Sequence, residues 1–237
     1  MLATYRRVLV VAAVPAEREA VLAATGDRAP HLDVIAGGVG PAAAAAATAA
    51  ALLTAAHRSR PYDLVVATGI GGGFAANGIE VGDTVVADRI VAADLGAETP
   101  TGFVSVAELG FGTAEHAPPP HLVREAAGTT GARTGPVLSV STTTGSRERA
   151  EQLLAHHPGA AVEAMEGFGV AQAAAAHAAA LGEGPPVLEL RTVSNTVGPR
   201  DRAAWRIPQA LAALTAAFAK LVPQHHTEGL PSWTRTP

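Results

Sequence analysis

Apolar runs recur along the chain, and most are followed by a polar or glycine-rich segment and then by a helical pattern. Such runs are typical of strands that are covered on both faces. They predict strands over Val8–Val14, Leu32–Ala36, Leu64–Thr68, Asp83–Ala87, Val137–Ser141 and Val187–Val193. Helices are expected over Glu17–Ala24, Ala42–His57, Arg147–His156, Val162–Ala180 and Arg206–Leu221. Strands that alternate with helices predict an α/β fold around a mostly parallel sheet.

The length of 237 residues suits one α/β domain, which we expect over residues 1–222. The segment 223–237 is rich in Pro, His and Thr and is predicted to be a flexible tail. Residues Ala93–Pro120 are rich in Gly and Pro and form a long excursion between predicted strands. Loops of that length usually shape sites or interfaces in compact domains.

The composition excludes several classes of protein. Hydrophobic residues make up 48% and charged residues 16%, which predicts a packed core and argues against disorder. The net charge is −4 and the basic residues form no stripe, so we expect no nucleic-acid partner. The absence of cysteine excludes disulfides and thiolate chemistry. The nine histidines lack a metal-binding spacing, and we predict neither a metal nor a cofactor.

The apolar run Val8–Val14 is too short to be read as a secretory signal and is better explained as a buried strand. No stretch approaches the roughly 20 apolar residues needed to span a bilayer. We therefore expect a cytoplasmic protein without a membrane partner.

Five polar or glycine-rich clusters follow predicted strands, and ligands of such sheets sit at the carboxyl ends of the strands. The clusters are Pro15–Glu19, Gly37–Pro41, Gly69–Gly73, Thr142–Ser146 and Ser194–Asp201. Their convergence on one edge predicts a pocket without naming its reaction.

Glycines at Gly69–Gly73 suit either a tight turn or a backbone that approaches a ligand closely. No Lys-Ser or Lys-Thr follows them, so the segment is not a P-loop. No helical pattern begins there either. The spacing is therefore a poor dinucleotide fingerprint and argues against a Rossmann-type NAD enzyme.

Three acidic side chains are candidates for chemistry. Glu17 is either a general base or a charge that complements a helix dipole. Glu163 and Glu166, three residues apart, would share a helix face. They are either paired carboxylates for glycosidic acid/base work or a first-turn pair. Glu166 precedes an apolar helix and needs polar partners, for which sugar hydroxyls are suitable.

Two neutral residues also have two interpretations each. Met165 either packs on a ribose face or belongs to the core. Asn195 follows an apolar strand, and its carboxamide either reads the edge of a heterocycle or forms a turn.

Seven segments, taken together and in order, resemble the nucleoside phosphorylase and nucleosidase superfamily, especially the methylthioadenosine/adenosylhomocysteine nucleosidases. The segments are VVAAVPAERE, GGVGPAAAA, VVATGIGGG, NGIEVGDTVVAD, VLSVSTTTGS, VEAMEGFGVA and LRTVSNTVGPRD. They span roughly residues 8–220. The resemblance implies a three-layer α/β/α sandwich around a mixed sheet.

The resemblance also implies roles for individual residues. Glu17 matches the carboxylate that activates water. Met165 and Glu166 match the pair that binds ribose, and Glu166 would hold the 2′- and 3′-hydroxyls. Glu163 falls one residue away from the neighbouring family Glu, so no role is carried over to it.

Two further segments match the rest of the family's pocket. Thr143 and Thr144 lie where the base stacks on a backbone segment, although this loop is shorter than in the adenine enzymes. Ile70, Gly71 and Gly72 match the loop beneath the ribose.

Two departures from the family pattern bear on the substrate. The phosphorylases carry an Arg before the glycine-rich loop, whereas Val66-Ala67-Thr68 holds no cation, which favours water as the nucleophile. The adenine nucleosidases have an Asp where this chain has Asn195. An amide can donate to a ring nitrogen or a 6-keto oxygen, which favours a hypoxanthine-type base and gives Asn195 both catalytic and base-binding roles.

The combination SN-x-VGPRDR-x-x-W resembles the futalosine hydrolases of this superfamily. That resemblance implies cleavage of futalosine to hypoxanthine and dehypoxanthine futalosine in menaquinone biosynthesis. Trp205 and Val39 would then face the 5′ group. Arg200 and Arg202 are candidates for its carboxylate, or else they belong to a solvated loop.

Rival interpretations remain at this stage. They are another 6-oxopurine nucleosidase, an adenine nucleosidase, and a nucleoside-binding protein without turnover. The resemblance also implies a homodimer or higher homo-oligomer, in which Ala93–Pro120 and Val39 could complete the pocket of a neighbouring subunit.

Overall fold

A computed structural model describes residues 1–222, and the predicted tail over 223–237 lies outside the described residues. Seven strands of the main sheet follow the order β10-β4-β8-β9-β3-β1-β2, and β7 pairs with β4 as the eighth. These strands are β1 Val8–Ala12, β2 Leu32–Ala36, β3 Leu64–Gly73, β4 Thr84–Ala92, β7 Glu115–His116, β8 Arg133–Ser139, β9 Val162–Ala164 and β10 Val187–Thr196. The helices are α1 Pro15–Thr25, α2 Pro41–His57, α3 Pro120–Thr130, α4 Arg147–His156, α5 Gly167–Leu181 and α6 Ile207–Leu221.

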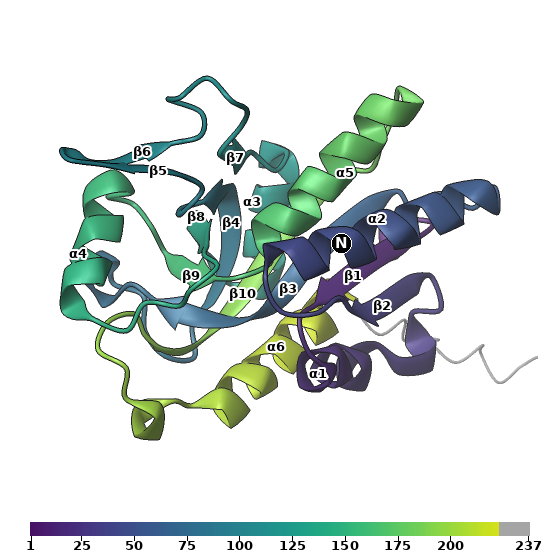
Figure 1. The fold of residues 1–237 in the computed structure, drawn as a ribbon. Helices are drawn as coiled ribbons and strands as arrows, with labels where there is room; N and C mark the ends of the chain where they lie inside the picture. The colour runs from purple at the N-terminus through teal and green to yellow at the C-terminus, as the bar shows by residue number, and fades with distance from the viewer. Residues whose placement is uncertain (223–237) are drawn as a thin grey trace, which may run out of the picture.

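Alternation along the central strands gives the sheet two apolar faces. Val8 and Val10 pack with α1, α3 and α6 in one cluster, whereas Leu9 and Val11 pack with α2 and α5 in another. Figure 1 shows α2 and α5 on one side of the sheet and α1 and α6 on the other. The expected α/β class is confirmed, and the uninterrupted apolar runs of the sequence are explained by burial on both faces.

The sheet is mixed, and part of it closes on itself. β3 pairs with both β9 and β10, β10 pairs with β4, and β8 joins β4 to β9. The β10–β4 and β3–β9 pairings are antiparallel, whereas β1–β3, β3–β10 and β4–β8 are parallel. Five strands therefore form a closed circuit, from which β1 and β2 extend beyond β3.

Three strands run further than the sequence predicts. β4, which was predicted to end at Ala87, continues to Ala92. β3 continues through the glycines to Gly73, and β10 continues to Thr196. The two strands pair in parallel as far as Thr196 and Gly73, which holds the glycine-rich run in extended form. The prediction that Leu64–Thr68 and Val187–Val193 end these strands is therefore wrong, and Asn195 lies in a strand rather than a turn.

The predicted helix over Val162–Ala180 is wrong at its beginning. Val162–Ala164 form β9, which pairs with β8 and with the end of β3, and α5 begins only at Gly167. Tertiary pairing on both sides overrides the local helical pattern here.

The excursion Ala93–Pro120 contains a small hairpin and a short strand. The hairpin joins β5 Gly96–Thr99 to β6 Gly102–Ser105, and β7 follows it. The helix α3 after the excursion was not predicted from the sequence. The apolar face of α3 gives a weak helical pattern, because its buried apolar residues are only Leu122, Val123 and Ala126.

The first turns of α2 and α5 lie against each other at the carboxyl edge of the sheet. A side-chain carbon at Gly169 would lie 2.0 Å from the carbonyl oxygen of Pro41, so only glycine permits this approach. The approach brings Gly40, before α2, next to Glu166, before α5, and so begins the polar site.

Among residues 1–222, no helix is both long enough and apolar enough to cross a bilayer.

Candidate active site

Glu17 lies in the first turn of α1 and is only 4% exposed. Its Oε2 accepts hydrogen bonds from the backbone N–H groups of Ala13 and Val14 at 2.9 and 3.2 Å. Its Oε1 accepts from the N–H of Ile70 at 2.9 Å. The carboxylate therefore complements the helix start, as the simpler interpretation predicts, and also reaches the glycine-rich end of β3.

A buried arginine, Arg191, also lies next to Gly69 of the glycine-rich strand. A side-chain carbon at Gly69 would lie 2.6 Å from Glu17 Oε1 and 2.9 Å from Arg191 Nη1. Gly69 has a φ of +151°, within the range that favours glycine. Only a residue without a side chain leaves this space free between the carboxylate and the guanidinium.

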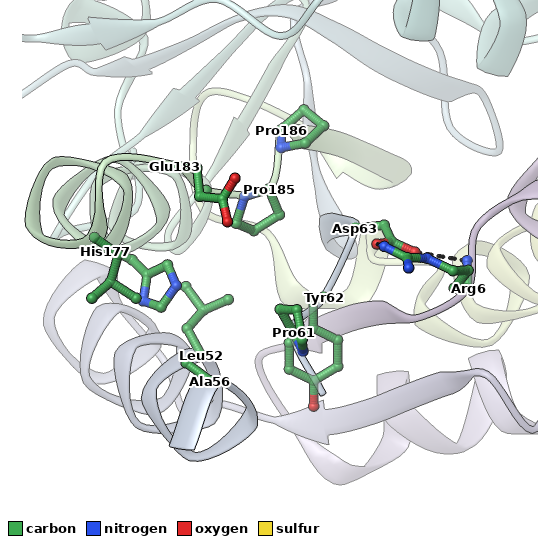
Figure 2. Close-up of a pocket in the computed structure, with 12 residues that line it drawn as sticks. Arg6, Leu52, Ala56, Pro61, Tyr62, Asp63, His177, Glu183, Pro185 and Pro186 are labelled. Atoms are coloured by element: carbon green, nitrogen blue, oxygen red, sulfur yellow. Dashed lines mark hydrogen bonds and ion pairs between the residues drawn. The ribbon is translucent and has the colours of Figure 1, made fainter. Parts of the chain in front are cut away.

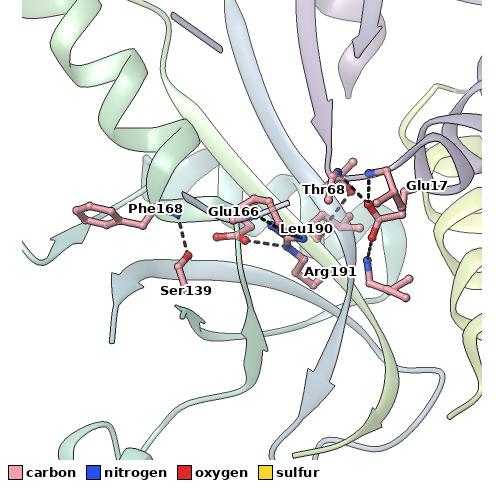
Figure 3. A network of polar contacts seen from close by, with 12 residues as sticks. Glu17, Thr68, Ser139, Glu166, Phe168, Leu190 and Arg191 are labelled. Atoms are coloured by element: carbon pink, nitrogen blue, oxygen red, sulfur yellow. Dashed lines mark hydrogen bonds and ion pairs between the residues drawn. The ribbon is translucent and has the colours of Figure 1, made fainter. Parts of the chain in front are cut away.

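Arg191 is fully buried and joins two carboxylates (Figure 3). Its Nε donates to Glu189 Oε1 at 2.8 Å, and its Nη1 donates to Glu166 Oε2 at 3.1 Å. Glu166 Oε1 also accepts from the N–H of Gly40 at 3.2 Å. The side chain of Glu166 is therefore fixed from both α2 and β10.

The charges in this cluster compensate one another. Burial lowers the pKa of Arg191, but Glu189, Glu166 and Glu17 outweigh that effect and raise its pKa above the ordinary value. The guanidinium consequently stays charged. Complete burial raises the pKa of Glu189, although Arg191 opposes this shift. Within residues 1–222, Glu189 Oε2 and Arg191 Nη2 have no hydrogen-bond partner.

Glu163 and Glu166 do not share a helix face, contrary to the prediction from their spacing. Glu163 lies in β9, and Glu166 is the residue that precedes α5. Glu163 Oε1 accepts from Thr144 N at 2.8 Å, and Oε2 accepts from the Thr144 hydroxyl. Because the two carboxylates bind different parts of the molecule, they do not form a pair.

Asn195 lies beside Gly72 on the neighbouring strand. Its Oδ1 accepts from the Ser194 hydroxyl at 2.9 Å, and its Nδ2 donates to the carbonyl of Thr196 at 3.0 Å. A side-chain carbon at Gly72 would lie 3.3 Å from this Nδ2. The amide thus faces the end of β3 that also carries Ile70 and Gly71.

Arg200 joins the segment after β8 to the segment after β10. Its Nη1 donates to the Thr143 hydroxyl at 3.4 Å, and its backbone N–H donates to the carbonyl of Gly145 at 3.2 Å. Its guanidinium lies 5.4 Å from the centre of the Trp205 ring. Arg200, Thr143 and Trp205 therefore lie together. Arg200 and Arg202 are both exposed.

Two remaining candidates lie beside the cluster. Met165 is half-buried next to Glu166. Val39 is 56% exposed and precedes Gly40, which contacts Glu166.

Arg191 and Glu189 were not predicted as part of the site. A signal was available, because the two charges alternate with apolar residues inside the strand Val187–Val193. Charged side chains in a strand that is covered on both faces must be paired. Together with Glu166, they form the buried ionic cluster described above.

A cavity of about 430 Å³ lies at the opposite end of the sheet (Figure 2). Asp63 and Pro186, which precede β3 and β10, line it together with Arg6 and His177. It opens at the amino ends of the strands, whereas Glu17, Glu166 and Asn195 lie towards their carboxyl ends. Ligands of open α/β sheets bind at the carboxyl ends.

Among the described residues, no group of three or more His, Asp or Glu side chains could hold a metal ion.

An α/β sheet with buried carboxylates at its carboxyl edge is typical of enzymes that act on small polar molecules. The chain belongs to the phosphorylase superfamily, whose family model matches residues 7–223. The family resemblance drawn from the sequence is thereby confirmed.

Several curated relatives carry the name futalosine hydrolase. The protein from Streptomyces coelicolor is 62% identical over 191 residues, which are 81% of this chain and 78% of the relative. The protein from Acidothermus cellulolyticus is 44% identical over 230 residues, which are 90% of this chain and 89% of the relative. The more specific resemblance to futalosine hydrolases is thereby confirmed as well.

Solved structures share the fold at low sequence identity. A methylthioadenosine/adenosylhomocysteine nucleosidase from Neisseria meningitidis aligns with a TM-score of 0.75 at 20% identity, covering 92% of this chain and 98% of the other. The futalosine hydrolase of Helicobacter pylori aligns with a TM-score of 0.74 at 16% identity, covering 93% and 98%. These structures confirm the predicted nucleoside phosphorylase/hydrolase fold.

Proposed function

We propose that this protein hydrolyses the N-glycosidic bond of futalosine and releases hypoxanthine and dehypoxanthine futalosine, as a step of menaquinone biosynthesis. The observation that carries the reaction is the placement of two buried carboxylates, Glu17 and Glu166, on either side of Gly69 and Arg191. The choice of substrate is supported by the relatives named futalosine hydrolase, which are 62% and 44% identical.

In the proposed mechanism, the bond between the anomeric carbon and the base breaks with its electron pair going to the base. A water oxygen bonds to the anomeric carbon, and Glu17 takes one proton from that water. The other hydrogen stays on the new sugar hydroxyl, and the proton held by Glu17 passes over the cycle to the released base. Glu166 accepts from the 2′- and 3′-hydroxyls, and Met165 packs on the ribose.

The remaining residues of the proposed site hold the base and the underside of the ribose. Asn195 donates to a ring nitrogen or to the 6-keto oxygen of hypoxanthine as negative charge develops there. Thr143 and Thr144 form the wall beside the base, and Ile70, Gly71 and Gly72 form the floor beneath the ribose. Asn195 and Glu163 both pair with Gly72 at the end of β3, and Glu163 accepts from Thr144, which supports this assignment.

The 5′ extension of futalosine ends in a benzoate and needs an aromatic wall and a cation. Trp205 with Arg200 next to its ring meets both needs. Arg202 is a second candidate cation, and Val39 adds apolar surface next to Glu166.

Water is favoured over phosphate because the buried cation beside Gly69 is already paired. Arg191 donates to Glu189 and Glu166, so a phosphate would compete with two carboxylates for the same guanidinium.

The test is to incubate the protein with futalosine, inosine and methylthioadenosine in parallel, with and without phosphate, and to measure the released base by chromatography. We expect hypoxanthine from futalosine at a rate that is independent of phosphate. Incorporation of oxygen-18 from labelled water into the sugar product would support hydrolysis. Release of adenine from methylthioadenosine as the main activity, or ligand binding without turnover, would refute the proposal.

We also propose that the protein works as a homodimer or higher homo-oligomer. Phe111 is 80% exposed and Leu95 is 45% exposed, both within the excursion Ala93–Pro120. Leu95 also lines an apolar cavity of about 290 Å³ between α2 and α5. A second copy that covered this surface would remove these side chains from water.

Sedimentation analysis of the wild type and of Phe111→Asp tests the assembly. We expect a dimer or larger species for the wild type and weaker association for the variant. A wild type that stays monomeric at assay concentration would rule out the assembly. The cytoplasmic location remains a prediction, to be checked by cell fractionation.

A further inference from the structure

The segment after β8, residues 141–146, is held by side chains from elsewhere in the chain. Asp94 Oδ2 accepts from the N–H of Ser141 at 2.6 Å. Glu163 accepts from both the N–H and the hydroxyl of Thr144. These contacts fix the beginning and the middle of the segment that the proposed function places beside the base.

Glu163 is the most deeply buried of these partners, with 6% of its surface exposed. Desolvation raises the pKa of its carboxyl, while the two hydrogen bonds from Thr144 oppose that shift. A buried carboxylate is costly to keep unless it is well bonded. Because a neutral apolar residue would avoid this cost, the presence of Glu163 calls for a reason beyond packing.

The backbone of Glu163 contacts the other wall of the proposed pocket. β9 places Glu163 opposite Gly72 in the antiparallel pairing with β3. A side-chain carbon at Gly71 would lie 2.7 Å from the carbonyl oxygen of Glu163. One residue thus touches the floor through its backbone and holds the base wall through its side chain.

We infer that Glu163 is a positioning residue that fixes the Thr143–Thr144 wall relative to the Gly71–Gly72 floor, and so sets the slot for the purine. This inference rests on the proposed function. Glu163 acts through Thr144, because both of its carboxylate oxygens bond to that residue. It is therefore distinct from a group that gives a proton to the base.

Loss of the carboxylate should loosen the wall before it affects the reacting atoms. The Thr144 N–H and hydroxyl would then bond to water, and the base would have to order the segment when it binds. For Glu163→Ala we expect KM for futalosine and Kd for hypoxanthine to rise about tenfold, with a smaller change in kcat.

Glu163→Gln is the conservative variant. Its amide oxygen can accept from Thr144 N while its amide nitrogen donates to the Thr144 hydroxyl. A positioning role predicts KM and Kd within about threefold of the wild type. A proton donor at this position would instead lose most of its kcat in the same variant. The matched control is Glu151→Ala, an exposed residue on α4.

The experiment measures hypoxanthine binding by calorimetry, futalosine kinetics, thermal unfolding, and hydrogen exchange of residues 141–146 for all variants. Faster exchange and weaker binding in Glu163→Ala, with recovery in Glu163→Gln, would support the inference. Lower thermal stability with unchanged Kd and KM would overturn it, because the residue would then be purely structural. Loss of kcat in Glu163→Gln would overturn it too.

Two further readouts keep the outcomes separate. If Glu163→Ala does not fold, Thr144→Val tests the hydroxyl bond alone, and an unchanged Kd for hypoxanthine there would refute the inference. If the wild type binds hypoxanthine but does not cleave futalosine, the proposed function fails, while Kd and hydrogen exchange still decide the role of Glu163. A wild type that does not bind hypoxanthine would refute both.

Discussion

Arg191 donates to Glu166 across 3.1 Å, and its side chain is completely buried at this ion pair. The pair connects β10 to the residue that precedes α5. A buried ion pair is weak evidence for net stability, but the loss of one partner is expensive because the other charge stays buried. The ion pair therefore holds Glu166 in place and makes the site sensitive to any change at Arg191.

Replacement of Arg191 by Met should destabilise the protein by about 3–5 kcal/mol, since Glu166 and Glu189 would lose their shared cation. Urea unfolding measures the change. Arg124→Met, an exposed position on α3, is the control and should stay close to the wild type. Equal stabilities of the two variants would contradict the role of Arg191 in the cluster.

Gly69→Ala should greatly reduce activity, because the new methyl group would enter the space between Glu17 and Arg191. A displacement of this kind can cost about a hundredfold in kcat. Gly128→Ala is a matched control on α3, where an added carbon meets nothing within 4 Å. We expect this control to keep full activity and to gain about 0.5–1 kcal/mol in stability.

Glu17→Gln should lower kcat by about 10²–10⁴-fold and change hypoxanthine affinity much less, because only the water-activating step needs the base. Steady-state kinetics and calorimetry separate the two effects. Glu19→Gln, an exposed position two residues along, should behave as the wild type. Near-normal turnover in Glu17→Gln would show that another group activates the water.

Asn195→Asp should lower futalosine turnover by about tenfold or more, because the side chain loses the amide that donates to the base. Its second oxygen would also face the carbonyl of Thr196, to which the amide now donates. Parallel assays with futalosine and methylthioadenosine measure the change in preference. An unchanged ratio of the two activities would contradict the assignment of Asn195 to the base.

The pH dependence of stability should reflect Glu189, since burial raises the pKa of its carboxyl above the usual 4.5. A carboxyl pKa that is raised by folding contributes stability that is fully present below the unfolded pKa and is lost as pH rises through the folded pKa. Glu189→Gln cannot ionise, so its unfolding free energy should fall less as the pH rises above the usual carboxyl pKa of 4.5. Glu183→Gln, which is exposed, should keep the wild-type slope.

Much of this architecture follows from local patterns in the chain. The run Val8–Ala12 is a buried strand, because Val8 and Val10 pack with helices on one face and Leu9 and Val11 with helices on the other. The glycine–proline segment before α2 ends the preceding extended segment and begins the helix, as expected for Pro at a first helical turn. Glu17 could be selected from the sequence because it follows a buried strand and lies in the first turn of the next helix.

Other features depended on contacts between distant residues. Val162–Ala164 adopt a strand because β8 and β3 offer pairing on both sides, although the local sequence favours a helix. The carboxylates of Glu163 and Glu166 consequently separate. The local pattern of apolar residues cannot predict whether Val162–Ala164 form a strand or a helix, because the strands with which they pair lie more than 20 residues away in the chain.

The α/β class and the family could be predicted from the chain alone, because apolar runs and short motifs are local properties. The same patterns predict a site at the carboxyl edge of the sheet. Which charges meet depends on the packing of strands and helices that are far apart in the chain. Arg191 reaches Glu166 because β10 lies beside β3 and α5 begins at the same edge, while Glu163 turns towards Thr144. Pairing of buried charges is set by distances across the sheet, and those distances exist only after the chain has closed on itself.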